Sequence, residues 1–113
     1  MIDPDLLANQ RQELRRGSVV LACLLVLREP GYGYGLLESL NAAGIDVDAN
    51  TLYPLLRRLE KLELLMSEWD TSESRPRKFY RTSPDGDELA VQLLQDWTTL
   101  TDTLTTLTPG QTS

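Results

Sequence analysis

The chain has 113 residues, which is enough for one domain whose core needs neither disulfides nor a metal ion. Hydrophobic residues make up 41% of it and charged residues 25%, and its formal net charge of −6 predicts weak non-specific binding to nucleic acid. Because it has no histidine and no Gly-rich phosphate loop, it lacks the usual signatures of His-assisted catalysis, zinc binding and nucleotide binding, and we expect neither an enzyme nor a cofactor or metal site.

The N-terminal segment predicts one helix over residues 3–28. Asp3 and Pro4 are a typical N-cap and first helical residue. An apolar stripe recurs every seven residues, at Leu7, Leu14 and Leu21. The apolar run over residues 19–27 is only about half as long as a bilayer span, so it predicts a buried helix and no association with a membrane.

The single cysteine, Cys23, lies within this apolar run and has no cation beside it in the sequence. We therefore expect a buried and unreactive thiol. One cysteine also excludes an internal disulfide, which fits a reducing compartment, and no secretory leader is evident. These features predict a cytoplasmic location.

A turn is predicted at residues 32–35, where glycines and tyrosines alternate. A short amphipathic helix follows it and ends before Gly44, which suits the left-handed position after a helix. Residues 45–48 alternate apolar and acidic side chains and predict a brief extended link.

A third helix is predicted from its N-cap, Asp48, to about residue 63. Pro54 is unfavourable deep inside a helix, so we expect the regular helix to begin near Asn50 or Thr51. At 100° per residue, its leucines gather on one side. The opposite side carries Asn50, Pro54, Arg57, Arg58 and Lys61.

Two short strands, over residues 64–70 and 77–82, and the turn-like segment between them predict a β-hairpin. Four cations and no acid lie near its second strand: Arg75, Arg77, Lys78 and Arg81. Such a local excess of positive charge attracts phosphates at contact even when the net charge is negative, because salt screens distant charges.

Ser83 and Pro84 repeat the N-cap and proline signal and open a last helix. Its apolar residues are spaced 3-4-3-4-3, as in a coiled-coil seam: Ala90, Leu93, Trp97, Leu100, Leu104 and Leu107. Seven threonines between residues 98 and 108 make it a poor helix in isolation, so we expect it to be ordered by packing on another surface. Residues 109–113 are expected to form a frayed tail.

This order of elements predicts a fold that is mainly α with a small β-hairpin, namely a winged helix-turn-helix followed by a C-terminal dimerisation helix. Residues 1–82 form the predicted winged helix domain, and the helix over residues 3–28 is expected to contribute to the dimer as well. Residues 83–108 form the predicted dimerisation helix.

Three blocks of the sequence resemble the PadR-like family of transcriptional regulators. They are residues 30–36 (PGYGYGL), residues 50–60 (NTLYPLLRRLE), and residues 77–81 (RKFYR) followed by Ser83 and Gly86. The blocks keep the order and spacing of the family, and the resemblance covers about residues 17–86. The single trailing helix is similar to the compact subgroup of the family.

The resemblance implies a homodimer in which the last helix packs on the partner's first helix. It also implies a repressor that binds palindromic sites in double-stranded DNA, and some family members release DNA when a small aromatic or drug-like ligand binds. Three positions depart from the family pattern. Glu63 stands where the family usually has Gly, residues 74–76 (SRP) where the wing tip often has Gly-Gly, and Thr82 where an apolar residue is expected. The departures predict a stiffer wing tip and, at Thr82, weaker anchoring of the wing.

The candidate DNA-binding residues lie on the polar side of the third helix and in the hairpin: Asn50, Thr51, Tyr53, Pro54, Arg57, Arg58, Lys61, Arg75, Arg77 and Lys78. Arginine suits guanine edges and phosphates, and asparagine suits adenine. Composition alone also fits a simpler interpretation. The helix cations then form a solvated face near Glu60 and Glu63, and the hairpin cations prevent aggregation through an exposed strand edge.

The candidate dimer interface consists of Leu7, Leu14, Leu93, Trp97, Leu100, Leu104 and Leu107. Two interpretations of Trp97 stay open. It either fills the core of the dimer, or its two copies flank a cavity for a flat ligand.

These patterns lead to the hypothesis of a sequence-specific DNA-binding transcriptional regulator, a repressor that a small aromatic or drug-like ligand relieves. Two alternatives remain. The negative net charge favours a winged helix that serves as a protein–protein interaction module, and Trp97 is the basis for a small-molecule-binding module without DNA activity.

Overall fold

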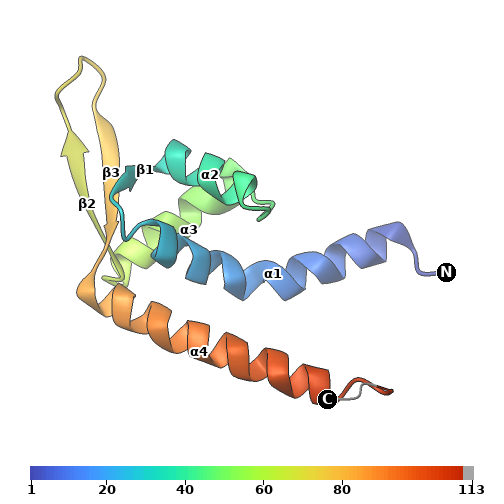
Figure 1. Ribbon diagram of the computed structural model, residues 1–113. Helices are drawn as coiled ribbons and strands as arrows, with labels where there is room; N and C mark the ends of the chain where they lie inside the picture. Colours follow the sequence, from blue (N-terminus) through green and yellow to red (C-terminus); the bar gives the residue numbers. More distant parts are fainter. Residues whose placement is uncertain (111–113) are drawn as a thin grey trace.

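The computed structural model describes residues 1–110, which form four helices and a small antiparallel sheet (Figure 1). The elements in chain order are α1 (Pro4–Val26), β1 (Gly31–Tyr32), α2 (Gly33–Ala42), α3 (Ala49–Lys61), β2 (Leu65–Asp70), β3 (Arg77–Thr82) and α4 (Pro84–Thr106). The predicted winged helix-turn-helix architecture is confirmed. Residues 111–113 of the predicted C-terminal tail lie outside the described residues. None of the helices within residues 1–110 is long and apolar enough to cross a membrane.

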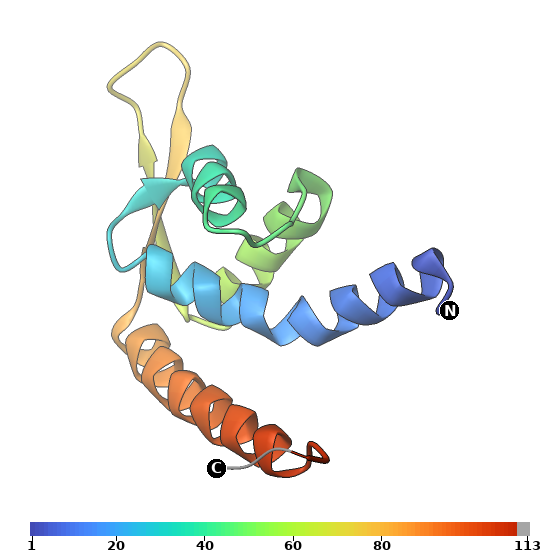
Figure 2. The same ribbon diagram turned by 45° about the vertical axis from the view of Figure 1, so that its right-hand side comes forward.

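The first helix, α1, has one half inside the core and one half outside it. Its N-cap is Asp3, whose carboxylate accepts the N–H of Leu6 at 3.3 Å, and Pro4 follows as predicted. Its buried residues all lie in the second half: Val19, Leu21, Cys23 and Leu24. The first half projects away from the other elements (Figures 1 and 2). This half therefore lacks packing partners within the described chain.

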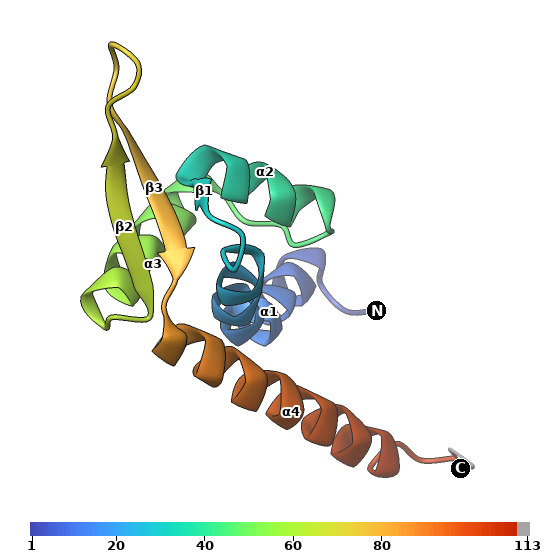
Figure 3. The same cartoon turned by 60° about the vertical axis from the view of Figure 1, so that its left-hand side comes forward.

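The sheet has the order β1-β3-β2, so it contains one strand more than the predicted hairpin. Gly31 pairs with Tyr80 and Tyr32 with Phe79, whereas the sequence predicts a turn that begins at Tyr32. A strand of two residues carries no periodic pattern, and it forms only because β3 offers a free edge. Beyond this short strand, β2 and β3 continue as a wing that rises past α2 and α3 (Figure 3).

Leucine dominates the core, which α1, α2, α3 and the base of the sheet build together. The largest side chains with less than 2% exposure are Leu24, Leu27, Leu40, Leu52, Leu56, Leu65 and Cys23. Cys23 is buried, as predicted. Burial raises the pKa of its thiol to about 12, which disfavours the reactive thiolate.

Two helices end in the same left-handed turn. After α2, Gly44 has φ 97°, its N–H bonds to the Asn41 carbonyl, and the Ile45 N–H bonds to the Leu40 carbonyl, which is the predicted glycine cap. After α3, the residue in the corresponding position is Glu63, with φ 63°. A side chain at such a φ costs about 1 kcal/mol or more, because its Cβ crowds the following carbonyl.

Replacing Glu63 with Gly is expected to stabilise the fold by about 0.5 to 1 kcal/mol, because glycine adopts positive φ without steric cost. The midpoint of urea unfolding should rise accordingly. Glu63→Ala is the control, since it removes the same carboxylate but keeps the Cβ, and its midpoint should stay close to that of the parent. Equal midpoints for the Gly and Ala variants would show that the turn is not strained.

The end of β3 ties α1 to the wing. The Thr82 hydroxyl donates to the Leu24 carbonyl at 2.7 Å, and the Thr82 N–H donates to the Leu27 carbonyl at 2.9 Å. Leu24 lies in the last turn of α1 and Leu27 is its C-cap, and the carbonyls at a helix end lack helical donors. The expectation that Thr82 weakens the anchoring of the wing is therefore wrong: its buried hydroxyl supplies a hydrogen bond that an apolar side chain does not offer.

The fourth helix, α4, begins against the same junction. The Ser83 side chain caps it by accepting the Gly86 N–H at 3.0 Å, and the same hydroxyl donates to the Glu63 carbonyl at 2.7 Å. Ala90 is fully buried and Leu93 packs against the core. Beyond Leu93 the helix leaves the core and runs free of the other elements (Figure 3).

Candidate nucleic-acid interface

Helix α3 presents a polar face to solvent. Asp48 caps it by accepting the Thr51 N–H at 2.9 Å, and the helix begins at Ala49, one residue before the earliest predicted start. Its buried residues are Leu52, Leu55, Leu56 and Leu59. Its exposed predicted residues are Asn50, Thr51, Pro54, Arg57, Arg58 and Lys61. The predicted division of this helix into an apolar and a polar side is confirmed.

Pro54 lies within the helix without ending it. A proline removes the helical bond to the carbonyl four residues earlier, which here belongs to Asn50. Because both residues are exposed, water can solvate that carbonyl. The helix therefore continues as one piece and keeps its polar face intact.

The polar face has two flanks that point in different directions. At 100° per residue, Thr51 and Arg58 lie on one side of its centre, and Tyr53 and Glu60 lie on the other. Thr51 and Arg58 face α1. Tyr53 packs against the start of α2, since a Cβ at Gly33 would lie 2.6 Å from the Tyr53 ring, and Glu60 faces the wing.

The wing lysine is held by α3. Lys78 Nζ donates to Glu60 Oε1 at 2.7 Å, and the Ser67 hydroxyl donates to the other oxygen of the same carboxylate. These hydrogen bonds, that of Lys78 first, lower the pKa of Glu60, and the Glu60 carboxylate in turn raises the pKa of Lys78. Lys78 is half-buried and is neutralised within the protein.

The wing arginine Arg77 is also engaged. Its guanidinium lies 4.3 Å from the centre of the Tyr32 ring, donates to the Tyr34 hydroxyl at 2.8 Å and pairs with Glu73 at 3.2 Å. The Tyr32 and Tyr34 rings are stacked with centroids 5.6 Å apart. These contacts connect the first residue of β3 to β1 and to the start of α2. Arg77 is therefore engaged by three residues of its own chain.

Asp70 completes this cluster. It accepts hydrogen bonds from the Ser72 hydroxyl and N–H and from the Tyr32 hydroxyl, and together they lower its pKa to about 2. The bond to Asp70 also raises the pKa of Tyr32. Arg75, the third wing cation among the candidate DNA-binding residues, is exposed and forms no ion pair among residues 1–110.

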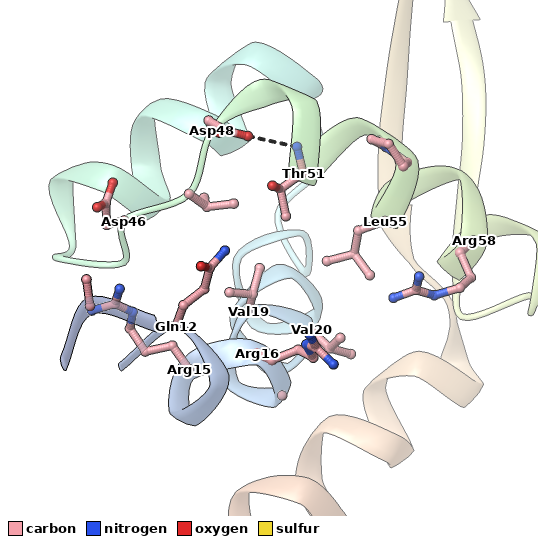
Figure 4. Close-up of a pocket in the computed structure, with 14 residues that line it drawn as sticks. Gln12, Arg15, Arg16, Val19, Val20, Asp46, Asp48, Thr51, Leu55 and Arg58 are labelled. Carbon is pink, nitrogen blue, oxygen red and sulfur yellow. Dashed lines mark hydrogen bonds between the residues drawn. The ribbon is translucent and has the colours of Figure 1, made fainter. Parts of the chain in front are cut away.

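A groove with a volume of about 890 Å³ lies between α1, the link before α3, and α3 itself (Figure 4). Its floor is apolar and includes Val19, Val20 and Leu55. Arg15 and Arg16 of α1 border one side, and Arg58 of α3 borders the other.

The predicted dimer residues are spread over two helices. Leu14 is 70% exposed on the projecting half of α1, and Leu7 is half-buried there. On the free part of α4, the exposed fractions are 44% for Trp97, 52% for Leu100 and Leu104, and 70% for Leu107. Leu93 packs against the core of its own chain. The described chain therefore leaves most of this apolar set without a partner.

A family model, the transcriptional regulator PadR-like family, matches residues 20–92, which is more than half of the chain. The protein belongs to the PadR-like family of transcriptional regulators. The crystal structure of a PadR family transcriptional regulator from Eggerthella lenta is similar over 95% of this chain and 96% of that one, with a TM-score of 0.88 and 46% identity. A PadR-like transcriptional regulator from Bacillus cereus is similar over 88% of this chain and 99% of that one, with a TM-score of 0.77 and 28% identity.

A curated relative of this PadR-like chain is the transcriptional regulator Rv3488 of Mycobacterium tuberculosis. The two are 42% identical over 55 residues, which is 49% of this chain. The match spans only about half of that protein, 51% of its length.

In this PadR-like regulator, sequence analysis missed two features of the candidate interface. The first is the ion pair between Glu60 and Lys78, although alternation along β3 could have placed Lys78 on the same face as Tyr80. The second is the groove, whose two walls are more than 25 residues apart in the sequence. No local pattern joins such walls, because tertiary packing alone brings them together.

Proposed function

We propose that this PadR-like regulator is a sequence-specific DNA-binding repressor that acts in the cytoplasm. The supporting observation is the polar face of α3, where Arg57, Arg58 and Lys61 are exposed on the side opposite the buried leucines and form no ion pair among residues 1–110. Phosphate contacts from these cations supply affinity, and Asn50 and Thr51 at the N-terminal end of the helix reach base edges.

The proposed repressor is a homodimer. Two copies of α3 related by a two-fold axis enter successive major grooves, about 34 Å apart, so the operator is palindromic. The unpartnered apolar residues of α4, including Trp97 and Leu104, and the projecting half of α1 support this assembly. Residues 1–82 then serve mainly as the DNA-binding domain and residues 83–108 as the dimerisation helix.

A small aromatic or drug-like ligand is proposed to relieve repression by binding at the dimer seam beside Trp97. Its half-exposed indole offers a flat apolar surface, and the neighbouring threonines are too small to cover it. A ligand changes the distance between the two copies of α3 only if it binds one dimer arrangement more tightly than the other. If Trp97 only fills the dimer core, no such relief occurs.

Duplex from the intergenic region upstream of the coding sequence should bind the purified protein in a gel shift. In titrations at several salt concentrations, log K should fall steeply and linearly with log salt, because cations displaced from the DNA backbone are released. A scrambled duplex of equal length is the control and should bind more weakly, and a panel of planar aromatic compounds tests release.

A folded protein that binds neither duplex would contradict the proposed function. It would favour a protein–protein interaction module, which the acidic residues of α4 and the net charge of −6 also fit. A protein that binds the aromatic compounds but no DNA would instead be a small-molecule-binding module.

A further inference from the structure

Helix α3 has about the same width as the groove it is proposed to enter. An α-helix with its side chains is about 10–12 Å wide, and the major groove of B-DNA is about 12 Å wide. A phosphate backbone must therefore run along each flank of α3. The two flanks meet different parts of the protein: Glu60 faces the wing, and Arg58 faces the groove beside α1.

The wing flank offers less free positive charge than the sequence suggests. Lys78 is bound to Glu60, and Arg77 is bound to Glu73 and lies against Tyr32. Each of these contacts must loosen, or be shared, before the cation can bind a phosphate. Among the four wing cations, Arg75 and Arg81 are exposed and form no ion pair in residues 1–110, and Arg81 lies near the end of β3 with its guanidinium 3.5 Å from Met66 Sδ.

The opposite flank is richer in cations. Arg16 approaches the groove from α1 at the end where Arg58 lies, and the Arg15 side chain extends toward the other end, where Asp46 lies (Figure 4). The ion pair of Arg16 with Glu13, at 3.0 Å, is between two exposed side chains and is therefore weak. Two aspartates also border the groove. Asp48 is occupied as the cap of α3, and Asp46 lies at the end far from Arg58 (Figure 4).

This cationic side of α1 differs from the side that is proposed to form the dimer. Arg15 and Arg16 follow Leu14 by one and two residues, so they point about 100° and about 200° around the helix from it. The leucine stripe can therefore contact a partner chain while the arginines still border the groove.

We propose that α1 is a second DNA-binding element, in which Arg15 and Arg16 bind the phosphate backbone that runs between α1 and the Arg58 flank of α3. The inference rests on the proposed function and deepens it. It assigns to the DNA interface a helix outside the recognition helix and the wing.

The test measures the binding of a labelled duplex from the upstream intergenic region, and of its scrambled control, by fluorescence anisotropy at several salt concentrations. In Arg15→Gln/Arg16→Gln, the slope of log K against log salt should fall by about 2, since each phosphate contact contributes about 0.9. The loss should appear with both duplexes, because phosphate contacts are independent of sequence. Arg15→Lys/Arg16→Lys should restore the slope.

Arg11→Gln/Arg28→Gln is the matched control. It removes two positive charges at positions that do not border the groove, one on α1 and one in the turn after it, so it changes the net charge equally and should keep the parental slope. Arg28 pairs with Asp87 at 3.2 Å, but both side chains are exposed, so the loss of this pair costs little stability. A slope in Arg15→Gln/Arg16→Gln equal to that of the control, or a loss that the lysine variant does not restore, overturns the inference. In both cases the unmodified protein still binds DNA, whereas a failure of the proposed function is a failure of the unmodified protein to bind.

Discussion

Gly86→Ala is expected to destabilise the protein by about 3 kcal/mol, because the close packing at this site leaves no room for a methyl group. A Cβ at this position would lie 2.2 Å from the Leu64 carbonyl oxygen and 2.7 Å from Thr82 Cγ2. The Leu64 oxygen is a backbone atom, so it cannot move away by a side-chain rotation. The start of α4 has to move instead, which stretches the bonds from Ser83 to the Leu64 and Glu63 carbonyls.

The loss should be visible as a fall of the melting temperature by about 12 °C, at about 4 °C per kcal/mol for a domain of this size. Gly35→Ala is the control. Gly35 also lies in the first turn of a helix, but a Cβ there meets nothing within 4 Å, so its melting temperature should stay the same or rise slightly. If the two alanine variants have the same melting temperature, α4 does not pack against the sheet as closely as the structure indicates.

The elements with strong local signals were predictable from the sequence. Asp48 and Ser83 cap helices as predicted, and Gly44 ends α2 in the left-handed conformation. The two sides of α3 follow from its 3.6-residue period, because the leucines and the cations alternate at that spacing. The winged helix fold followed from the order of these elements.

The features that sequence analysis missed depend on contacts between distant segments. The pairing of Gly31 with Tyr80 adds a strand to the predicted hairpin, and no two-residue pattern signals it. Thr82 departs from the apolar residue of the family, yet its hydroxyl meets the Leu24 carbonyl because α1 ends beside β3. The backbone of β1 and the Leu24 carbonyl both need a hydrogen-bond partner. The tertiary fold decides which residue supplies it, so the local sequence does not show it.

The same reasoning applies to the candidate DNA interface. Positive charge counted along the sequence favours the wing, but the fold pairs Lys78 with Glu60 and places Arg16 across a groove from Arg58. The charge that is free to meet a phosphate is therefore distributed differently from the charge in the sequence. A net charge of −6 is compatible with DNA binding because five of the seventeen acids lie on α4, which carries no cation, and others are occupied in pairs or caps, as Glu60 and Asp48 are.

The coiled-coil pattern of α4 is divided between two roles. Ala90 and Leu93 pack on the core of their own chain, whereas Trp97, Leu100 and Leu104 are about half exposed. Five of the seven threonines of this segment bond their hydroxyls to carbonyls of the helix itself, as Thr101 does to the Trp97 carbonyl, and so these five offer no contact that would order it. An isolated helix of this composition is unstable, so the free part of α4 requires a partner surface.

Leu100→Glu/Leu104→Glu is therefore expected to convert the proposed dimer into a monomer. Burial of the remaining half of four leucines contributes about 1 kcal/mol each, so the dimer dissociation constant should rise about 10³-fold or more. Sedimentation equilibrium measures this change, and affinity for a palindromic duplex should fall with it, because one monomer contacts only one half-site. Thr99→Glu/Thr106→Glu adds the same charge on the other side of α4 and should remain a dimer. If the leucine variant sediments as its parent does, the seam on α4 does not hold the dimer together, and the projecting half of α1 must do so alone.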